Sequence, residues 1–325
     1  MSYKKRNLIS YCPDLRVFDV TLRDGGLVNN FEFTDEFVSH LYRANIEAGV
    51  DYMEFGYKAD RDIFDPEKFG KWKFCNEEDI RSIVGENDTD LKISVMADVG
   101  RTNYKRDFLP KSESVIDIVR VALYIHQIPA AIEMIQYIKG LGYEVSANLM
   151  AVSKVNREDL RQALELLCEN SVDIIYIVDS FGNYYPEQMT ALAQMYVEIA
   201  DKYSVKVGIH AHNNQQLAFA NTIEAMRQGA DYMDATVCGM GRGAGNCFLE
   251  SLLGFLKNPK YSIVPIMKLV QNDMWKVREA GAVWGFDIQY MLTGILNTHP
   301  RPAIAFTKEK RTDYFDFYQE LLEND

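Results

Sequence analysis

Apolar and polar positions follow two alternating patterns along most of this chain. Short, almost wholly apolar runs predict strands, and stretches with apolar residues at three- and four-residue spacing predict amphipathic helices. The helical pattern is clearest at residues 34–50, 129–142, 157–170 and 186–203. The strand pattern occurs eight times, at residues 16–20, 51–56, 91–98, 115–123, 144–152, 172–179, 205–212 and 230–237.

This order of elements predicts the fold class. Apolar strands that alternate with amphipathic helices are typical of a parallel sheet covered on its outside. Eight such units within about 240 residues favour a closed (β/α)₈ or TIM barrel, an α/β fold, over an open doubly wound sheet. No GxGxxG motif follows an early strand, which counts against a Rossmann-type sheet.

The pattern changes after about residue 258, where helical stretches at residues 268–283 and 288–299 follow the last strand unit. No Pro-rich or low-complexity linker precedes them. We therefore expect a catalytic barrel over residues 1–258 and a helical C-terminal extension over residues 259–325 in the same domain. The Trp, Tyr, Met and Leu residues of this extension could pack on the barrel or on a second subunit, so we expect a homodimer.

Composition narrows the class of protein. The formal net charge is −12, from 47 acidic against 35 basic residues, and this field would repel a nucleic-acid backbone. No run of eighteen apolar residues is present, and the N-terminus lacks the apolar segment of a signal peptide, so we expect neither membrane insertion nor secretion. Five cysteines without a CxxC pair indicate reduced thiols and a cytoplasmic location.

The tripeptide HAH at residues 210–212 ends the seventh predicted strand. Residues two apart on a strand point to the same face, and their side chains start roughly 6–7 Å apart. In a barrel, catalytic groups gather at the carboxyl ends of the strands. We therefore predict that His210 and His212 bind one metal ion, the alternative being two hydrogen-bonding surface histidines.

A carboxylate should complete such a site. The sequence FDVTLRDGG at residues 18–26 offers Asp19 within the first strand and Asp24 beyond its end. We favour Asp24, because the Gly-Gly pair predicts a turn that permits close approach to a ligand. The neighbouring Arg23 could neutralise an anionic substrate or a developing oxyanion. Two histidines and a carboxylate suit Mn²⁺, Mg²⁺, Zn²⁺ or Fe²⁺.

A glycine-rich loop follows the eighth strand. The sequence CGMGRGAGNCFLE at residues 238–250 has four glycines within seven residues, a backbone able to cradle a carboxylate or phosphate. Asn246, near the start of the next helix, could cap that helix or offer its carbonyl oxygen to a metal.

With these residues the chain resembles the metal-dependent aldolase and acyl-transferase barrels related to HMG-CoA lyase, isopropylmalate synthase and 4-hydroxy-2-oxovalerate aldolase. The resemblance covers residues 16 to about 258. The matching motifs, in the family's order and spacing, are TLRDGG (21–26), YMEFG (52–56), VRVA (119–122), VDSFGNYYPEQM (178–189), GIHAHNN (208–214) and GMGRGAGNCFLE (239–250).

The resemblance implies a mechanism and a role for individual residues. In this family a dication binds the enolate of a 2-oxo acid or a thioester and acts as a Lewis acid during carbon–carbon cleavage or condensation. The implied metal ligands are Asp24, His210, His212 and, as a fourth candidate, Asn246. Arg23 would stabilise the enolate oxygen, and Glu54 would orient groups of the site. The implied substrate-binding residues are Arg120, Asn148, Asp179, Ser180 and Gly243.

Leu27 departs from the family pattern. Aldolases of this family carry His at this position, and the synthases and the lyase carry Gln, whereas Leu can neither move a proton nor accept a hydrogen bond. We predict that His126 or Tyr290 supplies the missing catalytic group, with Lys58 and Asp98 as further candidates. Cys238 falls where related synthases have Asn, so we do not expect it to be the catalytic cysteine of the lyases.

We therefore expect a carbon–carbon lyase, an aldolase, that acts on a small 2-oxo acid with bound Mn²⁺ or Mg²⁺. An acetyl-CoA-dependent Claisen-type acyl transferase is the second hypothesis, although the tail is too short for the regulatory domain of the synthases. A barrel that lost its catalytic base at Leu27 and serves as a binding subunit is the third. A metal-dependent hydrolase is disfavoured, because such barrels usually carry HxH on the first strand and further histidines later.

Overall fold

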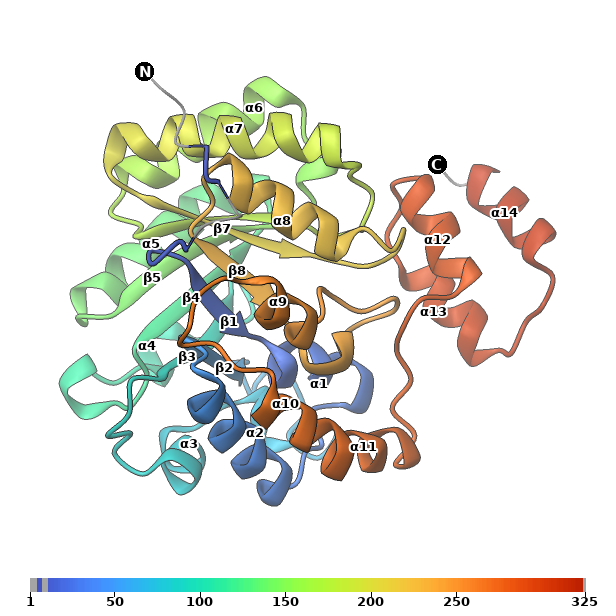
Figure 1. The fold of residues 1–325 in the computed structure, drawn as a ribbon. Coiled ribbons are helices and arrows are strands. Elements are labelled where there is room, and N and C mark those ends of the chain that lie inside the picture. Colours follow the sequence, from blue (N-terminus) through green and yellow to red (C-terminus); the bar gives the residue numbers. More distant parts are fainter. Residues whose placement is uncertain (1–4, 8–10, 324–325) are drawn as a thin grey trace.

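The computed structural model describes residues 5–7 and 11–323 and shows a barrel surrounded by helices (Figure 1). Eight parallel strands pair in chain order, and β1 pairs with β8 to close the ring. The predicted (β/α)₈ barrel is therefore confirmed. The strands are β1 (Arg16–Asp19), β2 (Tyr52–Tyr57), β3 (Lys92–Asp98), β4 (Ile118–Leu123), β5 (Glu144–Leu149), β6 (Ile174–Asp179), β7 (Lys206–Ala211) and β8 (Tyr232–Ala235).

Helices cover the outside of the barrel and continue beyond it. The segments predicted from helical spacing all form helices; in α2, for example, the Thr34 hydroxyl accepts a hydrogen bond from the Phe37 N–H, and Gly49 ends the helix at φ 75°. The helices of the barrel are α1 (Thr21–Asn29), α2 (Asp35–Ala48), α3 (Glu77–Val84), α4 (Tyr104–Asp107), α5 (Ile128–Gly140), α6 (Arg157–Glu169), α7 (Pro186–Tyr203), α8 (Ala218–Gln228) and α9 (Leu249–Phe255).

Alternation along the strands divides the core into two layers. Outward-facing residues such as Val17 and Met53 pack against the helices in one large apolar cluster. Inward-facing residues near the amino ends of the strands form a second cluster, in which Phe18 stacks on Tyr52 with ring centroids 4.3 Å apart. This cluster, which includes Tyr176, fills the lower barrel with packed rings and leaves the upper end for polar groups.

The sequence predicted a turn at the Gly-Gly pair after the first strand, and this prediction is wrong. Residues Thr21–Asn29 form helix α1, with both glycines inside it. Close packing explains them: a Cβ on Gly25 would lie 2.8 Å from the Met240 sulfur, and a Cβ on Gly26 would lie 2.1 Å from the Phe31 ring. Gly26 therefore makes room for Phe31, and Gly25 lets α1 approach the loop after β8, which places Asp24 at the barrel mouth.

The C-terminal extension packs beside the mouth of the barrel. It consists of α10 (Val264–Leu269), α11 (Trp275–Glu279), α12 (Ile288–Ile295), α13 (Arg301–Lys308) and α14 (Tyr314–Glu323), of which the last three lie to one side of the barrel (Figure 1). The Asn214 amide donates to the Tyr290 carbonyl at 3.1 Å, and the Asn297 amide donates to the Ser153 carbonyl at 3.1 Å. These bonds tie the extension to loops that follow β7 and β5.

Within residues 5–7 and 11–323, no helix combines the length and the apolar content needed to cross a bilayer. The assignment of barrel and extension to one domain, and the homodimer, stay predictions.

Candidate metal centre and active site

Three side chains from distant parts of the chain meet at the mouth of the barrel. Asp24 from α1, His210 from β7 and His212 just after β7 each offer a ligand atom, and these atoms lie within 4.8 Å of one another. All three residues are buried. The predicted convergence of two imidazoles and one carboxylate is confirmed.

The backbone fixes this arrangement by joining β7 to the glycine-rich loop. His212 forms an isolated antiparallel bridge with Asn246, and the Asn213 N–H donates to the Gly245 carbonyl at 2.8 Å. Gly241 permits the loop to come close, because a Cβ there would lie 2.4 Å from Asp24 Oδ2. Loop and strand together enclose the three ligand atoms.

The free polar atoms of this cluster fit a divalent cation. The Asn246 amide donates to Asp24 Oδ2 at 2.5 Å and to the Met240 carbonyl at 3.1 Å. Its Oδ1 is buried and has no hydrogen-bond partner among the described residues, and the same holds for His210 Nε2. A buried polar atom without a partner costs about 1–3 kcal/mol, which a bound cation would recover. One carboxylate, two imidazoles and one amide oxygen form the donor set.

Protonation favours metal binding as well. Burial lowers the pKa of His212 to about 3, so its imidazole is neutral at neutral pH. Burial alone would raise the pKa of Asp24, but the Arg23 guanidinium and the two histidines bring it well below its ordinary value. Metal ligands have to be deprotonated, and both groups are in that state without a metal.

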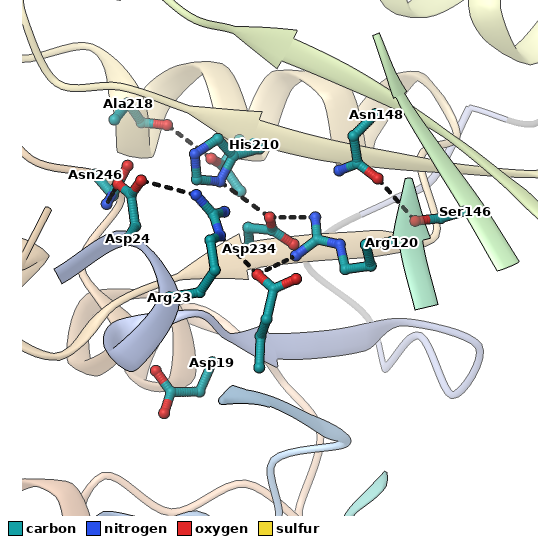
Figure 2. A network of polar contacts seen from close by, with 12 residues as sticks. Asp19, Arg23, Asp24, Arg120, Ser146, Asn148, His210, Ala218, Asp234 and Asn246 are labelled. Carbon is teal, nitrogen blue, oxygen red and sulfur yellow. Dashed lines mark hydrogen bonds and ion pairs between the residues drawn. The ribbon is translucent and has the colours of Figure 1, made fainter. Parts of the chain in front are cut away.

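A chain of buried charges runs beneath the ligands and returns to them (Figure 2). Arg23 donates to Asp24 at 2.7 Å and to Glu54 at 2.8 Å. Glu54 also accepts from Arg120 at 3.1 Å, and Arg120 donates to Asp234 at 2.6 Å. The side-chain charges therefore alternate in sign along a row that begins at one metal ligand and consists of Asp24, Arg23, Glu54, Arg120 and Asp234.

Asp234 closes this chain at the second ligand. Its Oδ2 lies 3.0 Å from His210 Nδ1, which leaves His210 Nε2 for the metal. The Arg120 guanidinium lies over the rings of Phe18 and Tyr176, 4.8 and 4.3 Å from their centroids. We did not single out Asp234 from the sequence, although an acidic residue inside an apolar strand was a usable signal.

A cavity of about 80 Å³ opens next to the ligands. Leu27 lines it, so the residue that departs from the family pattern does face the site. Its lining comes from α1, from β7, from the glycine-rich loop and from the carboxyl ends of β2 to β6: Arg23, Asp24, Leu27, Tyr57, Met96, Ala122, Asn148, Met150, Val178, Ser180, His210, His212 and Arg242.

Several predicted site residues do not line this cavity. Arg120 is fully buried below it, between Glu54 and Asp234, so its position indicates support of the site where we had predicted substrate contact. Asp179 is buried, its Oδ1 accepts from the Asn183 N–H at 3.0 Å, and burial raises its pKa to about 7. These two residues shape the site from behind its walls.

The predicted replacements for the missing base also lie elsewhere. His126 is exposed and stacks on the ring of Tyr124. The Tyr290 hydroxyl pairs with Thr307 at 3.2 Å, and its ring packs beside Gly243. Lys58 lies over the Phe108 ring in a separate cavity, and Asp98 and Cys238 do not line the cavity beside the ligands either.

Two polar residues of the cavity were missed by sequence reasoning, Tyr57 and Arg242. Tyr57 ends β2, three residues after Glu54, and Arg242 stands within the glycine-rich loop, where the glycines drew attention away from it. Burial raises the pKa of Tyr57 well above its ordinary value, so its phenol keeps its proton at neutral pH.

With this geometry in view, the similarity to known proteins is informative. The pattern of the HMGL-like family matches residues 14–279, most of the chain. The chain belongs to the HMGL-like family. A 4-hydroxy-2-oxovalerate aldolase of Pelotomaculum thermopropionicum is 29% identical over 83% of this chain and 76% of its own length. An oxaloacetate decarboxylase of Mycobacterium tuberculosis is 31% identical over 74% of this chain and 69% of its own length.

Solved structures support the fold. The N-terminal domain of a proposed aldolase from Bacteroides vulgatus superposes with a TM-score of 0.79 at 29% identity, and the match covers 90% of this chain and 96% of that one. The carboxyl transferase domain of Rhizobium etli pyruvate carboxylase superposes with a TM-score of 0.68 at 15% identity, over 91% of this chain and 54% of that one. The second likeness shows a shared barrel alone.

Proposed function

We propose that this protein is a divalent-metal-dependent carbon–carbon lyase, an aldolase that cleaves a small 2-oxo acid. The meeting of Asp24, His210 and His212 within 4.8 Å beside a small cavity carries this proposal. Relatives named for cleavage of 4-hydroxy-2-oxovalerate and for decarboxylation of oxaloacetate support a 2-oxo acid as the substrate class. We propose Mn²⁺ or Mg²⁺ as the metal, with Zn²⁺ as a further candidate.

A cation held by Asp24, His210, His212 and Asn246 would supply Lewis-acid stabilisation of negative charge on the substrate. Arg23 lines the same cavity and is held by Asp24 and Glu54, so its guanidinium is fixed before substrate arrives. A preorganised cation next to the site of charge development stabilises an enolate oxygen. We therefore assign Arg23 to oxyanion stabilisation and Glu54 to its orientation.

Proton transfer requires a group other than Leu27. Apart from the metal ligands and the arginines, the cavity-lining side chains with an O–H group are Tyr57 and Ser180, and a phenol is the stronger acid of the two. Burial raises the pKa of Tyr57, so the phenol is protonated at neutral pH and is available to donate a hydrogen bond or a proton. We propose Tyr57 as the proton donor of the site in place of His126 or Tyr290.

Metal content and product analysis test the proposed function. We expect purified protein to hold about one divalent ion per chain, and His210→Ala and His212→Ala to lose it. His40→Ala, a change on α2 away from the site, should retain the metal. Full metal content in both site variants would overturn the metal centre.

The products then separate the lyase from the acyl transferase. With Mn²⁺ present, the proposed lyase releases pyruvate from 4-hydroxy-2-oxovalerate or oxaloacetate. Release of free thiol from acetyl-CoA without any cleavage of 2-oxo acids would replace the lyase by an acyl transferase, and no turnover in either assay would indicate a barrel that only binds ligands.

A further inference from the structure

The arginines at the barrel mouth differ in whether their charge is compensated. Arg23 has two carboxylate partners, Asp24 and Glu54, at 2.7 and 2.8 Å. Arg242 lines the same cavity and forms no ion pair with any carboxylate of residues 5–7 and 11–323. One of its terminal nitrogens donates to the Ser180 carbonyl at 3.3 Å, and its buried Nε has no acceptor among the described residues.

A cation without a counterion is unexpected in this chain, which has twelve more acidic than basic residues (47 against 35). Burial lowers the pKa of Arg242, and the charge of Asp24, which forms no ion pair with it, offsets this lowering only in part. Removing a charge from water is unfavourable unless an opposite charge lies nearby. Asp24 is already paired with Arg23, so a carboxylate in direct contact with Arg242 is expected from outside the protein.

Asn148 offers a second unused donor to the same cavity. Its Oδ1 accepts a hydrogen bond from the Ser146 hydroxyl at 2.8 Å, which turns the amide nitrogen the other way. That nitrogen is buried and has no acceptor in the described part of the chain. Figure 2 shows Asn148 projecting from β5, on the other side of His210 from Asp24.

Arg242 and Asn148 lie toward the same side of the mouth. The bond from Arg242 to Ser180 ties the arginine to the end of β6, the neighbour of β5. In a closed barrel of eight strands, β5 lies opposite β1, after which Asp24 and Arg23 follow. The cavity therefore has Asp24 and Arg23 at the β1 side, the two histidines at the end of β7 farther along the wall, and a guanidinium with a free amide N–H toward β5 and β6.

We propose that Arg242 and Asn148 bind a second carboxylate of the substrate, so that the natural substrate is a short 2-oxo dicarboxylic acid. This inference rests on the proposed function, because the 2-oxo end is assigned to the metal and Arg23. Apolar side chains between the two ends, such as Met96 and Val178, suit a short methylene segment. A cavity of about 80 Å³ limits the length of that segment.

Cleavage of such a substrate is balanced without a further reactant. In 4-hydroxy-2-oxoglutarate, the C3–C4 bond breaks and its electron pair passes to C3. C3 takes up a proton from the Tyr57 phenol to give pyruvate, and the proton that the C4 hydroxyl loses as C4 becomes a carbonyl carbon restores that phenol, so no proton is gained or lost overall. The second product, glyoxylate, keeps the carboxylate that Arg242 binds.

Binding of matched ligands tests the subsite apart from turnover. We would titrate Mn²⁺-loaded protein with 2-oxoglutarate and with 2-oxovalerate, which has the same chain length and a methyl group in place of the second carboxylate. We expect 2-oxoglutarate to bind at least about tenfold more tightly, since a charge-assisted hydrogen bond contributes about 1.5–3 kcal/mol. The preference should fall below about twofold in Arg242→Met and be partly restored in Arg242→Lys.

Arg43→Met, a change at an exposed arginine of α2, is the matched control and should keep the preference. Unchanged binding of 2-oxovalerate shows that Arg242→Met is folded. Equal binding of the two acids to the unaltered protein, or a preference that persists in Arg242→Met, overturns the subsite.

Turnover assays distinguish failure of the carboxylate subsite from failure of the proposed function. Pyruvate release from 4-hydroxy-2-oxoglutarate and from 4-hydroxy-2-oxovalerate is compared in the same proteins. If both acids are cleaved equally well and Arg242→Met changes neither rate, the lyase stands and the subsite is wrong. If the binding preference is present but neither acid is cleaved, the subsite stands and the lyase is wrong.

Discussion

The two ends of the barrel interior are built from different chemistry. Near the amino ends of the strands, ring and aliphatic side chains such as Phe18, Tyr52 and Ile118 form an apolar cluster. At the mouth, Arg23, Glu54 and other ionised groups fill the same cross-section. Arg120 lies at the boundary, with its guanidinium between aromatic rings on one side and carboxylates on the other.

This difference separates stability from function. Apolar packing stabilises the fold directly, whereas buried ion pairs recover little beyond the cost of removing charges from water. A protein selected for stability alone would fill the mouth with apolar residues as well. The charged mouth therefore marks the part of the interior that serves the chemistry. Substitutions at the lower end should reduce stability, whereas substitutions at the mouth should reduce turnover or metal binding.

The largest expected effect on stability is at the lower end. Phe18→Ala removes a fully buried ring that stacks on Tyr52, and we expect unfolding to become easier by about 3–5 kcal/mol. Urea denaturation measures this change, and pyruvate release by the folded fraction should stay near that of the unaltered protein. Phe315→Ala, at an exposed phenylalanine, should change stability by less than about 0.5 kcal/mol. A large fall in turnover per folded molecule of Phe18→Ala would contradict the separation.

At the mouth, Arg23→Ala should act on turnover. We expect pyruvate release to fall about 10²–10³-fold, because a preorganised donor to the developing oxyanion is lost. The metal ligands remain, so metal content should not change. Steady-state kinetics and metal analysis on the same preparation check both statements. Turnover equal to that of the unaltered protein would remove Arg23 from the mechanism.

Asp234→Asn tests the support of a metal ligand by its neighbour. The carboxylate lies 3.0 Å from His210 Nδ1, and loss of its charge should weaken metal binding about 10–100-fold. A competition titration with a metal indicator measures the affinity. Asp201→Asn, at an exposed aspartate of α7, is the control and should leave the affinity unchanged. Equal affinities in the two variants would show that Asp234 has no part in holding His210.

The smallest effect is expected at Asp19, a buried carboxylate whose partners differ from those of Asp24 and Asp234. In the described part of the chain only neutral residues, Thr21 and Asn45, hydrogen-bond it, and burial raises its pKa to about 6. The folded state binds this proton more tightly than the unfolded state, so stability falls as pH rises from about 4 to about 6. Asp19→Asn should remove about 1–3 kcal/mol of this fall. Urea midpoints at pH 4.5 and 7.5 test it; an identical pH dependence in the variant would contradict the raised pKa.

The sequence predicted the barrel because a parallel sheet covered by helices needs two distinct periodicities, and both are strong here. The strand ends were less accurate; the eighth strand, for example, was predicted over residues 230–237 and spans Tyr232–Ala235. Alternation marks which residues are apolar, whereas the end of a strand depends on hydrogen bonds to its neighbours.

The metal cluster could be predicted because its residues follow strands that the fold brings to one edge. His210 and His212 are two apart on one strand, and Asp24 follows another. The roles of Arg242 and Asp234 could not be predicted in the same way. Whether an arginine has a counterion, or an aspartate supports a histidine, depends on side chains that are far away in the sequence, such as Arg120 and His210.

Asp24 and Asn246 are joined by a hydrogen bond although 222 positions separate them in the chain. A growing polypeptide thus has no complete cradle for a cation until its eighth strand and the loop behind it have been made. Metal binding should then accompany closure of the barrel. Fragments that stop before Asn246 should lack the full set of donor atoms even where their first strands are formed.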